Sequence, residues 1–572
     1  MEKNWTPQKT TNDSISAQLS SELNVDPIII HLLAQRGVGT YEEAHQFFRP
    51  NLNNLHDPFL MADMHTAVNR LSGALHHQEN ILIYGDYDVD GTTAVSLVYS
   101  FLKKIGGSCF FYIPDRYTEG YGFSFKGVDF ARENNCTLII TLDCGVRDGQ
   151  KIEYAQSHGI DVIVCDHHQP AEIPAAVAVL DPKRPDCNYP YKGLSGAGVG
   201  FKLLQALCIQ QSIDPSSLFE YLDLVTISIG ADIVPMTGEN RILAFYGLQK
   251  LQEMRRPGIA AMLQLAGFQK TALTITDVVF ILAPRINAAG RIFSGAKAVE
   301  LLLSVSEDEA LPLSRAIEEY NTTRKGLDKE ITAQAIQKIQ NDHFHQESLS
   351  IVVFDESWHK GVVGIVASRL IESYYKPTIV LVSDGQIMAG SARSIEGIDL
   401  FECLGECSET LTQFGGHTMA AGLSLEATNF TSFRLKFEEV IQQKLNHVRP
   451  VPTIRYDAEI EFQNITQKLY RIIKQFEPFG PENLSPVFLS RQVVNKRFTR
   501  TVGDGNKHLK LHVYQKSSPE IIVEGIGFDL GHWAEKLQAD RPVDILYSID
   551  ENHWNNKSSL QLIVKDIRES HL

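Results

Sequence analysis

The sequence predicts an α/β protein of several domains: a parallel-sheet domain, a long connecting helix, a second α/β domain and a small C-terminal β-barrel. Three observations carry this prediction. The chain has 572 residues, too many for one compact core. Apolar, strand-like runs alternate with helix-like stretches in the first half of the chain. From about residue 450 onward, strand-like runs follow one another with almost no helix between them.

The first domain is expected over residues 71–305, after an N-terminal extension (1–70) that is polar and carries only short helical patches. Strands are predicted at 81–84, 109–113, 138–142, 162–165 and 177–180, with helices at 92–105, 124–134, 150–158 and 198–209. Regular alternation of strands and helices requires a parallel sheet that helices cover on both faces.

The second half of the chain contains a helix, a second sheet and the barrel. Apolar residues close to one stripe predict a long connecting helix over 306–345. The second α/β domain (346–448) has predicted strands at 350–354, 378–382 and 388–391. Five or six strand-like runs with one helix in residues 449–572 are typical of a small barrel of the OB type.

Composition excludes several classes of protein. Hydrophobic residues make up 43% and charged residues 21%, which excludes a mostly disordered or fibrous chain. The net charge of −16 excludes a polycation, although one local basic groove would suffice for nucleic acid. Eight scattered cysteines without a CxxC pair indicate neither a zinc knuckle nor a disulfide framework. Without an apolar leader or a long apolar run, we expect a cytoplasmic protein that contacts no membrane.

Acidic and imidazole side chains follow the predicted strands of the first domain. They form four groups, each behind an apolar stretch that is expected to be a buried strand: Asp86, Asp88 and Asp90; Asp143; Asp166, His167 and His168; and Asp232. A single aspartate at a strand end is more often a helix cap. However, the carboxyl ends of parallel strands meet at one edge of the sheet, where ligands bind. The sequence therefore predicts that these groups converge.

Converging carboxylates repel one another unless a cation neutralises them. Carboxylate and imidazole ligands without thiolate favour Mn²⁺ or Mg²⁺ over a structural zinc. A site this acidic could hold two ions, which together would bridge a phosphate and activate water for in-line attack at phosphorus.

The motifs resemble the DHH phosphoesterase superfamily, and the resemblance covers about residues 75–570. GDYDVDG (85–91), LDCG (142–145), CDHH (165–168) and GAD (230–232) resemble the four ligand motifs of that superfamily. PRINAAGR (284–291), GSARS (390–394) and FGGHTMAAG (414–422) resemble its RecJ family of single-strand-specific 5′→3′ DNA exonucleases. The pyrophosphatase branch has a histidine where this chain has Tyr84, so the chain departs from that branch.

The resemblance implies a metal-dependent exodeoxyribonuclease that releases mononucleotides by two-metal-ion hydrolysis and acts in DNA repair and recombination. It implies that the metal ligands are Asp86, Asp88, Asp90, Asp143, His167 and Asp232. Asp143 would bridge the two Mn²⁺ or Mg²⁺ ions. His168 would orient or protonate the departing oxygen or hold a phosphate, and Asp166 would orient its neighbours.

Substrate phosphates require hydrogen-bond donors. We expect Arg116, Ser391 and Arg393 to capture a terminal 5′-phosphate, because arginine gives bidentate, always-charged recognition. Further candidates for contact with nucleic acid are Arg285, Arg291 and His417, which could instead form surface ion pairs, and Tyr121, which could instead be a core residue. On the barrel the candidates are Lys496, Arg497, Arg500 and Lys510, which could instead form an ordinary solvated face.

Two other functions stay open from the sequence alone. One is a phosphodiesterase for short oligonucleotides or cyclic dinucleotides, against which the added barrel and the length of the chain argue. The other is a DNA-binding scaffold that has lost catalysis, against which the complete carboxylate set argues, since unpaired acids would repel a bound phosphate. Besides single-stranded DNA, a single-stranded-DNA-binding protein and a helicase are the natural partners, and we expect a monomer.

Overall fold

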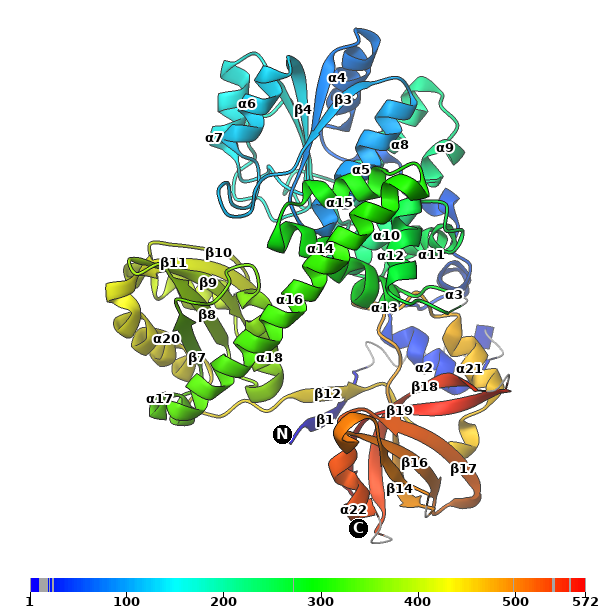
Figure 1. The fold of residues 1–572 in the computed structure, drawn as a ribbon. Helices are drawn as coiled ribbons and strands as arrows, with labels where there is room; N and C mark the ends of the chain where they lie inside the picture. The colour runs from blue at the N-terminus through cyan, green and yellow to red at the C-terminus, as the bar shows by residue number, and fades with distance from the viewer. Residues whose placement is uncertain are drawn as a thin grey trace.

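The computed structural model shows three sheet-containing units, two of which are joined by one long helix (Figure 1). It describes residues 2–9, 19, 21–22, 25–270, 272–496, 498–537, 541–554 and 557–570. None of the helices in these ranges combines the length and the apolar character needed to cross a bilayer. The predicted fold class is confirmed: a parallel sheet, a second α/β sheet and a C-terminal barrel follow one another.

The first sheet is parallel throughout, with the strand order β3-β2-β4-β5-β6. Its strands are β2 (Asn80–Gly85), β3 (Ser108–Tyr112), β4 (Cys136–Leu142), β5 (Asp161–Cys165) and β6 (Ala178–Leu180). The intervening helices are α5 (Val89–Lys104), α6 (Phe125–Glu133), α7 (Gly149–Ser157) and α8 (Gly196–Gln211). Alternate residues of β2 belong to two separate cores, Ile81 and Ile83 to one and Leu82 and Tyr84 to the other, because successive side chains point to opposite faces. Both faces of the sheet are therefore buried.

A group of helices follows the first sheet: α9 (Ser216–Phe219), α10 (Leu222–Ala231), α11 (Gly238–Gln252), α12 (Pro257–Leu265), α13 (Ile275–Asp277), a π-helical turn (Val278–Leu282), α14 (Ala283–Ile292) and α15 (Ala296–Leu303). One prediction is wrong here. Asp232 follows helix α10 and not a strand. Residues 222–230 are buried all round, so the apolar run has no periodicity that would separate a buried helix from a buried strand.

Helix α16 (Glu307–Asn341) joins the first unit to the second. It contacts α12 and α14 at one end, and α18 (Val363–Tyr374) and the second sheet at the other. The second sheet has the order β10-β11-β9-β8-β7, with β7 (Ile351–Asp355), β8 (Thr378–Ser383), β9 (Ile387–Arg393), β10 (Gln413–His417) and β11 (Ala420–Glu426). Strands β10 and β11 were not predicted, because glycines interrupt their apolar alternation.

The C-terminal unit is a closed barrel. Its order is β13-β14-β18-β19-β17-β16-β15, and an additional pairing of β14 with β16 closes it. The strands are β13 (Ala458–Glu459), β14 (Phe488–Asn495), β15 (Arg500–Val502), β16 (His508–Gln515), β17 (Ser518–Gly527), β18 (Val543–Trp554) and β19 (Lys557–Glu569). Helix α21 (Gln467–Lys474) occupies the predicted place between β13 and β14.

The N-terminal segment is more ordered than the sequence indicates. Helices α2 (Pro27–Gln35) and α3 (Tyr41–Phe48) supply Ile29, Leu32, Leu33 and Ala44 to the hydrophobic core of the barrel. Strand β1 (Asn4–Pro7) pairs in parallel with β12 (Thr453–Tyr456), just before the barrel. Helix α4 (Met64–His76), which was not predicted, packs against the first sheet domain. The two ends of the chain therefore share one folding unit.

Candidate metal centre and arginine cluster

The acidic loop after β2 is held in place by its own backbone. Asp88 caps the N-terminus of α5, and its Oδ1 accepts the amide hydrogen of Gly91 at 3.1 Å. A Cβ at Gly91 would lie 2.5 Å from the amide nitrogen of Asp86, so only glycine allows this close turn. The turn places Asp86 and Asp90 in the interior while Asp88 remains partly exposed.

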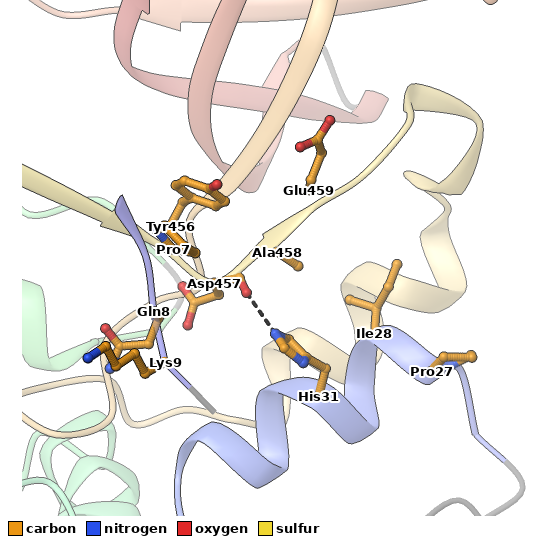
Figure 2. A pocket seen from close by; sticks show the side chains of 10 residues that line it. All are labelled: Pro7, Gln8, Lys9, Pro27, Ile28, His31, Tyr456, Asp457, Ala458 and Glu459. Atoms are coloured by element: carbon orange, nitrogen blue, oxygen red, sulfur yellow. Dashed lines mark hydrogen bonds between the residues drawn. The ribbon is translucent and has the colours of Figure 1, made fainter. Parts of the chain in front are cut away.

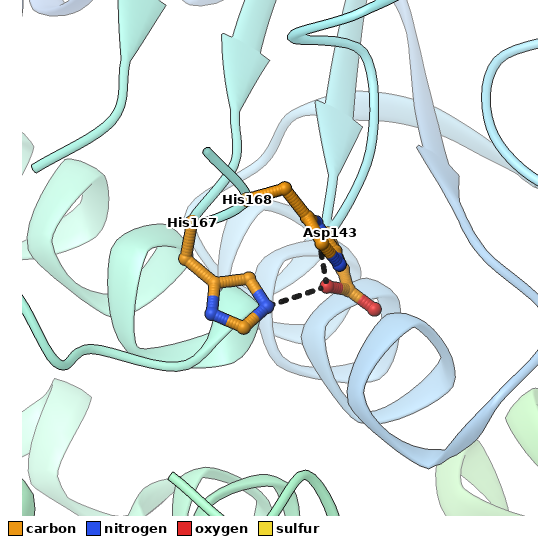
Figure 3. A group of neighbouring side chains, drawn as sticks. All are labelled: Asp143, His167 and His168. Carbon is orange, nitrogen blue, oxygen red and sulfur yellow. Dashed lines mark hydrogen bonds and ion pairs between the residues drawn. The ribbon is translucent and has the colours of Figure 1, made fainter. Parts of the chain in front are cut away.

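Four of the predicted ligands meet at the carboxyl edge of the sheet. The Nε2 atom of His167 lies 3.1 Å from Asp143 Oδ1, 3.6 Å from Asp90 Oδ2 and 3.5 Å from Asp232 Oδ2. Asp143 comes from the end of β4, His167 from the end of β5, Asp90 from the first turn of α5 and Asp232 from the end of α10. Figure 3 shows Asp143 facing His167 and His168. The topology thus gathers side chains that are 142 positions apart, from 90 to 232.

Asp90 is oriented by hydrogen bonds that sequence reasoning missed. Its carboxylate accepts the amide hydrogens of Gly196 at 2.6 Å and Ala197 at 2.8 Å, at the N-terminus of α8, and the hydroxyl of Ser228 at 2.7 Å. Gly196 also allows close approach, since a Cβ there would lie 2.6 Å from Asp143 Cβ. The signal for this contact is a serine followed by glycines at a helix start, Ser195 onward, which is typical of an N-cap.

The carboxylates are electrostatically strained in the absence of a cation. Burial, reinforced by neighbouring carboxylates, raises the pKa of Asp86, Asp143 and Asp232 well above the ordinary range. Burial and the charge of Asp90 also raise the pKa of Asp88. Both carboxylate oxygens of Asp86 are buried and accept no hydrogen bond within the described part of the chain. Such a buried carboxylate, next to the charge of Asp88, fits a divalent cation.

In the part of the chain that the structure describes, two groups of ligand atoms are close enough to hold an ion. Asp143, His167 and His168 form one group, and Asp90, His167 and Asp232 form the other, with the ligand atoms of each group within 4.8 Å of one another. Oxygen and imidazole donors without thiolate suit Mn²⁺ or Mg²⁺. His167 Nε2 is the nitrogen nearest the carboxylates in both groups, and its single lone pair can bind one ion.

The pKa values of the two histidines are shifted in opposite directions. Burial lowers the pKa of His167 to about 4, so its imidazole is neutral at physiological pH and offers a lone pair to a metal. Burial also acts to lower the pKa of His168, but the hydrogen bond from its Nδ1 to Asp166 Oδ1, at 2.7 Å, and the charge of Asp166 outweigh it and raise that pKa. Asp166 also accepts the amide hydrogen of Val146 at 3.0 Å. The hydrogen bond to Asp166 fixes the orientation of the His168 ring, and the part that Asp166 plays in catalysis stays a prediction.

Three arginines gather beside the carboxylates. The guanidinium carbon of Arg116 lies 4.8 Å from the ring centroid of Tyr87, the residue between Asp86 and Asp88. Burial, and then the charges of Arg116 and Arg393, lower the pKa of Arg291 to about 10, and burial and Arg116 lower the pKa of Arg393. Within the described ranges, no aspartate or glutamate forms an ion pair with these three arginines. Unpaired, mutually repelling guanidinium groups fit a bound anion.

The second domain contributes to the same cluster. Arg393 Nη1 donates a hydrogen bond to Ser391 Oγ at 2.8 Å, and both residues lie on β9. A Cβ at Gly364, in the first turn of α18, would lie 3.0 Å from Arg393 Nη2, so the helix N-terminus approaches the cluster closely. Ser391 and Arg393 thus lie on one strand beside the start of α18, and the phosphate pocket that they would form with Arg116 stays a prediction.

The other predicted contacts fall into different surroundings. Tyr121 donates its hydroxyl hydrogen toward the backbone oxygen of Asp143 at 3.3 Å and lies 3.1 Å from His168 Nε2, while its ring is half exposed. The imidazole of His417, on β10, stacks on that of His168 with centroids 6.0 Å apart. Arg285, in contrast, is committed to an ion pair with Glu318 of α16 at 2.5 Å.

Only some of the basic residues predicted to bind nucleic acid on the barrel are exposed and without an ion pair among the described residues. Lys510 pairs with Glu524 at 2.8 Å, whereas Lys496 and Arg500 are exposed. Arg497 lies outside the described residues. The exposed ring of Phe498 lies 5.9 Å from that of His512, so an aromatic pair lies on the same barrel as the exposed Lys496 and Arg500.

A groove of about 680 Å³ lies elsewhere, between β1, α2 and the segment from β12 to β13 (Figure 2). His31 faces into it, and its Nε2 lies 2.9 Å from the backbone oxygen of Asp457. The lining combines one lysine with two acids and apolar side chains, and no metal-ligand group lies among its described residues. The groove therefore offers no chemistry comparable to that of the metal centre.

The metal-free protein is expected to lose stability as the pH rises from about 5 to 8, and Mn²⁺ is expected to restore it. The raised pKa values of Asp86, Asp143 and Asp232 mean that the folded protein binds more protons than the unfolded chain, so deprotonation destabilises the fold. An ion at about a hundred times its dissociation constant adds about 2.7 kcal/mol to the free energy of unfolding.

Thermal unfolding midpoints in EDTA and in Mn²⁺, at about pH 5.5 and about pH 8, measure this effect. The Mn²⁺-induced rise should be larger at the higher pH. Asp129→Asn, which changes a surface acid of α6, is the control and should keep the rise. A rise of equal size at both pH values would contradict the assignment of the carboxylates as ligands.

Comparison with known proteins gives three domain matches that follow the three sheets in order. They are the DHH family N-terminal domain over residues 80–229, the DHHA1 domain over 346–443 and the RecJ OB domain over 456–566. The chain is 36% identical over 565 residues to the single-stranded-DNA-specific exonuclease RecJ of Bacillus subtilis, covering 98% of this chain and 70% of that relative. It is 32% identical over 574 residues to RecJ of Salmonella typhimurium, covering 96% and 98%. The crystal structure of Thermus thermophilus RecJ in complex with Mn²⁺ superposes with a TM-score of 0.84 at 26% identity, covering 100% of this chain and 80% of that one.

Proposed function

Because the chain belongs to the RecJ family of single-stranded-DNA-specific exonucleases, we propose that it hydrolyses single-stranded DNA from the 5′ end and releases mononucleotides. It is a metal-dependent exonuclease that acts in DNA repair and recombination. The observation that carries the proposal is the position of the arginine cluster of Arg116, Arg291 and Arg393, directly beside the carboxylates that would hold the ions. A pocket for a terminal phosphate next to a hydrolytic centre restricts cleavage to the end of a strand.

The residues of this chain have separable roles in the reaction. Asp86, Asp88, Asp90, Asp143, His167 and Asp232 would hold two Mn²⁺ or Mg²⁺ ions, with Asp143 as the bridge. When bound, such ions neutralise charge on the phosphate and lower the pKa of a coordinated water. His168, oriented by Asp166, lies at the edge of this centre with a raised pKa, so it can donate a proton or a hydrogen bond to the departing oxygen.

Contact between the two lobes supports selection of single strands. His417 of the second domain stacks on His168 of the first, and Arg291 Nη1 donates a hydrogen bond to the backbone oxygen of Gly361 at 3.2 Å. The lobes therefore meet directly over the metal centre. A passage bounded by both lobes would admit one strand and exclude a duplex by size, without reading bases. The barrel, with Lys496 and Arg500 exposed, would hold the strand farther from its end.

Digestion of strands labelled at either end tests the proposal. With Mn²⁺ or Mg²⁺, a 5′-labelled strand should release labelled mononucleotide at once, whereas a 3′-labelled strand should shorten gradually. A duplex of the same sequence is the matched substrate control and should resist digestion. Activity confined to oligomers of a few nucleotides would instead favour a phosphodiesterase for short oligonucleotides. A single-stranded-DNA-binding protein and a helicase, which expose single strands, are the partners we propose for a cytoplasmic monomer.

A further inference from the structure

A buried arginine without an ionic partner lies where three parts of the chain meet. Arg241 of α11 is 5% exposed, and no ion pair to it occurs among the residues that the structure describes. Within the described ranges, its hydrogen-bond partners are all backbone oxygens that belong to other parts of the fold. A buried charge is retained only where its hydrogen bonds compensate for the loss of water. Burial of Arg241 is therefore stable only while these segments supply their backbone oxygens, and Arg241 in turn holds the segments together.

The first segment that Arg241 holds belongs to the barrel unit. Its Nη1 donates to the backbone oxygen of Phe476 at 2.6 Å, and its Nη2 donates to that of Gln475 at 3.3 Å. These residues begin the 475–484 segment, which connects α21 to β14. On the other side of Arg241, Nη2 donates to the backbone oxygen of Phe47 at 3.1 Å, and the guanidinium carbon lies 4.0 Å from the ring centroid of Phe47. One side chain thus ties the catalytic domain to both the barrel segment and α3.

The same segment reaches the turn that carries a metal ligand. Met236 lies four residues after Asp232, and its backbone amide donates a hydrogen bond to the backbone oxygen of Pro481 at 2.8 Å. Inside the segment, Asn483 is 1% exposed, and its Nδ2 donates to the backbone oxygen of Phe476 at 2.9 Å. Arg36 Nε donates to Asn483 Oδ1 at 2.8 Å, which adds a second arginine from the N-terminal segment. The 475–484 segment is therefore held at both ends against the catalytic domain.

We infer that Arg241 is a positioning residue that fixes the barrel relative to the metal centre, so that one long strand can occupy both. The inference rests on the proposed function, because the occupant is single-stranded DNA. Two binding sites in a fixed relation act as one extended site, and the gain in affinity is lost when the geometry no longer permits simultaneous contact. A strand too short to reach the barrel gains nothing from the junction.

The test compares long and short 5′-phosphorylated strands. Arg241→Met keeps the length and apolar stem of the side chain but removes every donor, so the barrel segment loses its anchor. For this variant, kcat/KM on a strand of about 40 nucleotides should fall about tenfold, whereas kcat/KM on a strand of about six should change less than about twofold. The loss should lie in KM. Arg241→Lys, which keeps the charge and some of the donors, should recover part of the lost efficiency on long strands.

Matched controls separate this role from a general loss of stability. Arg256→Met removes a similar, partly buried arginine that pairs with Asp223 inside the catalytic unit and does not contact the barrel; it should leave the ratio of long-strand to short-strand efficiency unchanged. If Arg241→Met fails to fold, Arg36→Met, which acts on the opposite side of the same segment, should lower the ratio instead.

The outcomes are distinct. Equal losses on long and short strands, or no loss on either, would overturn the inference and leave the proposed exonuclease intact. If the unaltered protein itself shows no advantage for long strands, the barrel does not hold the strand, and the inference fails together with that part of the proposed function.

Discussion

Asp143→Asn is expected to lower kcat/KM on 5′-phosphorylated single strands by about a thousandfold or more, because about 4 kcal/mol of transition-state stabilisation depends on the ions that this carboxylate would bridge. Asp143 lies 3.1 Å from His167 and belongs to one of the two candidate ligand groups. The amide has nearly the same shape but no charge, so the fold should persist. Because burial and neighbouring acids raise the pKa of Asp143, removal of its charge should even stabilise the metal-free protein.

Single-turnover digestion of end-labelled strands measures the loss, and thermal unfolding in EDTA measures the stability. Asp129→Asn, on the surface of α6, is the matched control and should leave both unchanged. Strand binding in the presence of Ca²⁺ should remain, since the arginine cluster is intact. Retention of more than about a tenth of the activity would reject Asp143 as a bridging ligand.

Arg393→Ala is expected to lower kcat/KM by about a hundredfold on 5′-phosphorylated strands and by no more than about threefold on 5′-hydroxyl strands, because charge-assisted hydrogen bonds to phosphate contribute about 1.5–3 kcal/mol each. Arg393 has no acidic partner among the residues that the structure describes, donates a hydrogen bond to Ser391 and lies beside the like charge of Arg116, so an anion is its natural partner. Loss of the Arg393 side chain should therefore lower kcat/KM strongly only on strands that carry the terminal phosphate.

Parallel digestion of the two substrates gives this ratio directly. Arg285→Ala is the matched control, since Arg285 is also buried but is committed to Glu318. That variant should change both substrates by the same factor. Equal losses on both substrates for Arg393→Ala would reject the 5′-phosphate pocket.

The acidic centre could be predicted from the sequence because its residues follow recognisable apolar stretches. Asp143 and His167 each follow an apolar strand, and parallel strands end at one edge of the sheet, so the neighbouring strands β4 and β5 bring the two together without knowledge of the packing. Asp232 does join the acidic cluster, as predicted, but it follows a helix and not the predicted strand. Its helix, α10, is buried on all sides and has no polar face that would reveal a helical period.

Contacts between distant parts of the chain could not be predicted in this way. Nothing near Arg285 or Lys510 in the sequence indicates that Glu318 and Glu524 neutralise them. In the same way, the apolar face of α2 is consistent with any core, and only the structure shows that it packs against the barrel. Local patterns define elements and strand ends, whereas the pairing of faces and charges depends on the tertiary fold.

The shared core of the two chain ends has a consequence for biosynthesis. Helices α2 and α3 leave the ribosome early, but the barrel whose core they share is translated roughly 20 to 100 seconds later, at about 5–20 residues per second. The first sheet domain, encoded between them, can fold in the meantime. Nascent chains should therefore expose these two helices to chaperones until the last strand emerges, and a truncation that removes β19 should leave a hydrophobic N-terminus prone to aggregation.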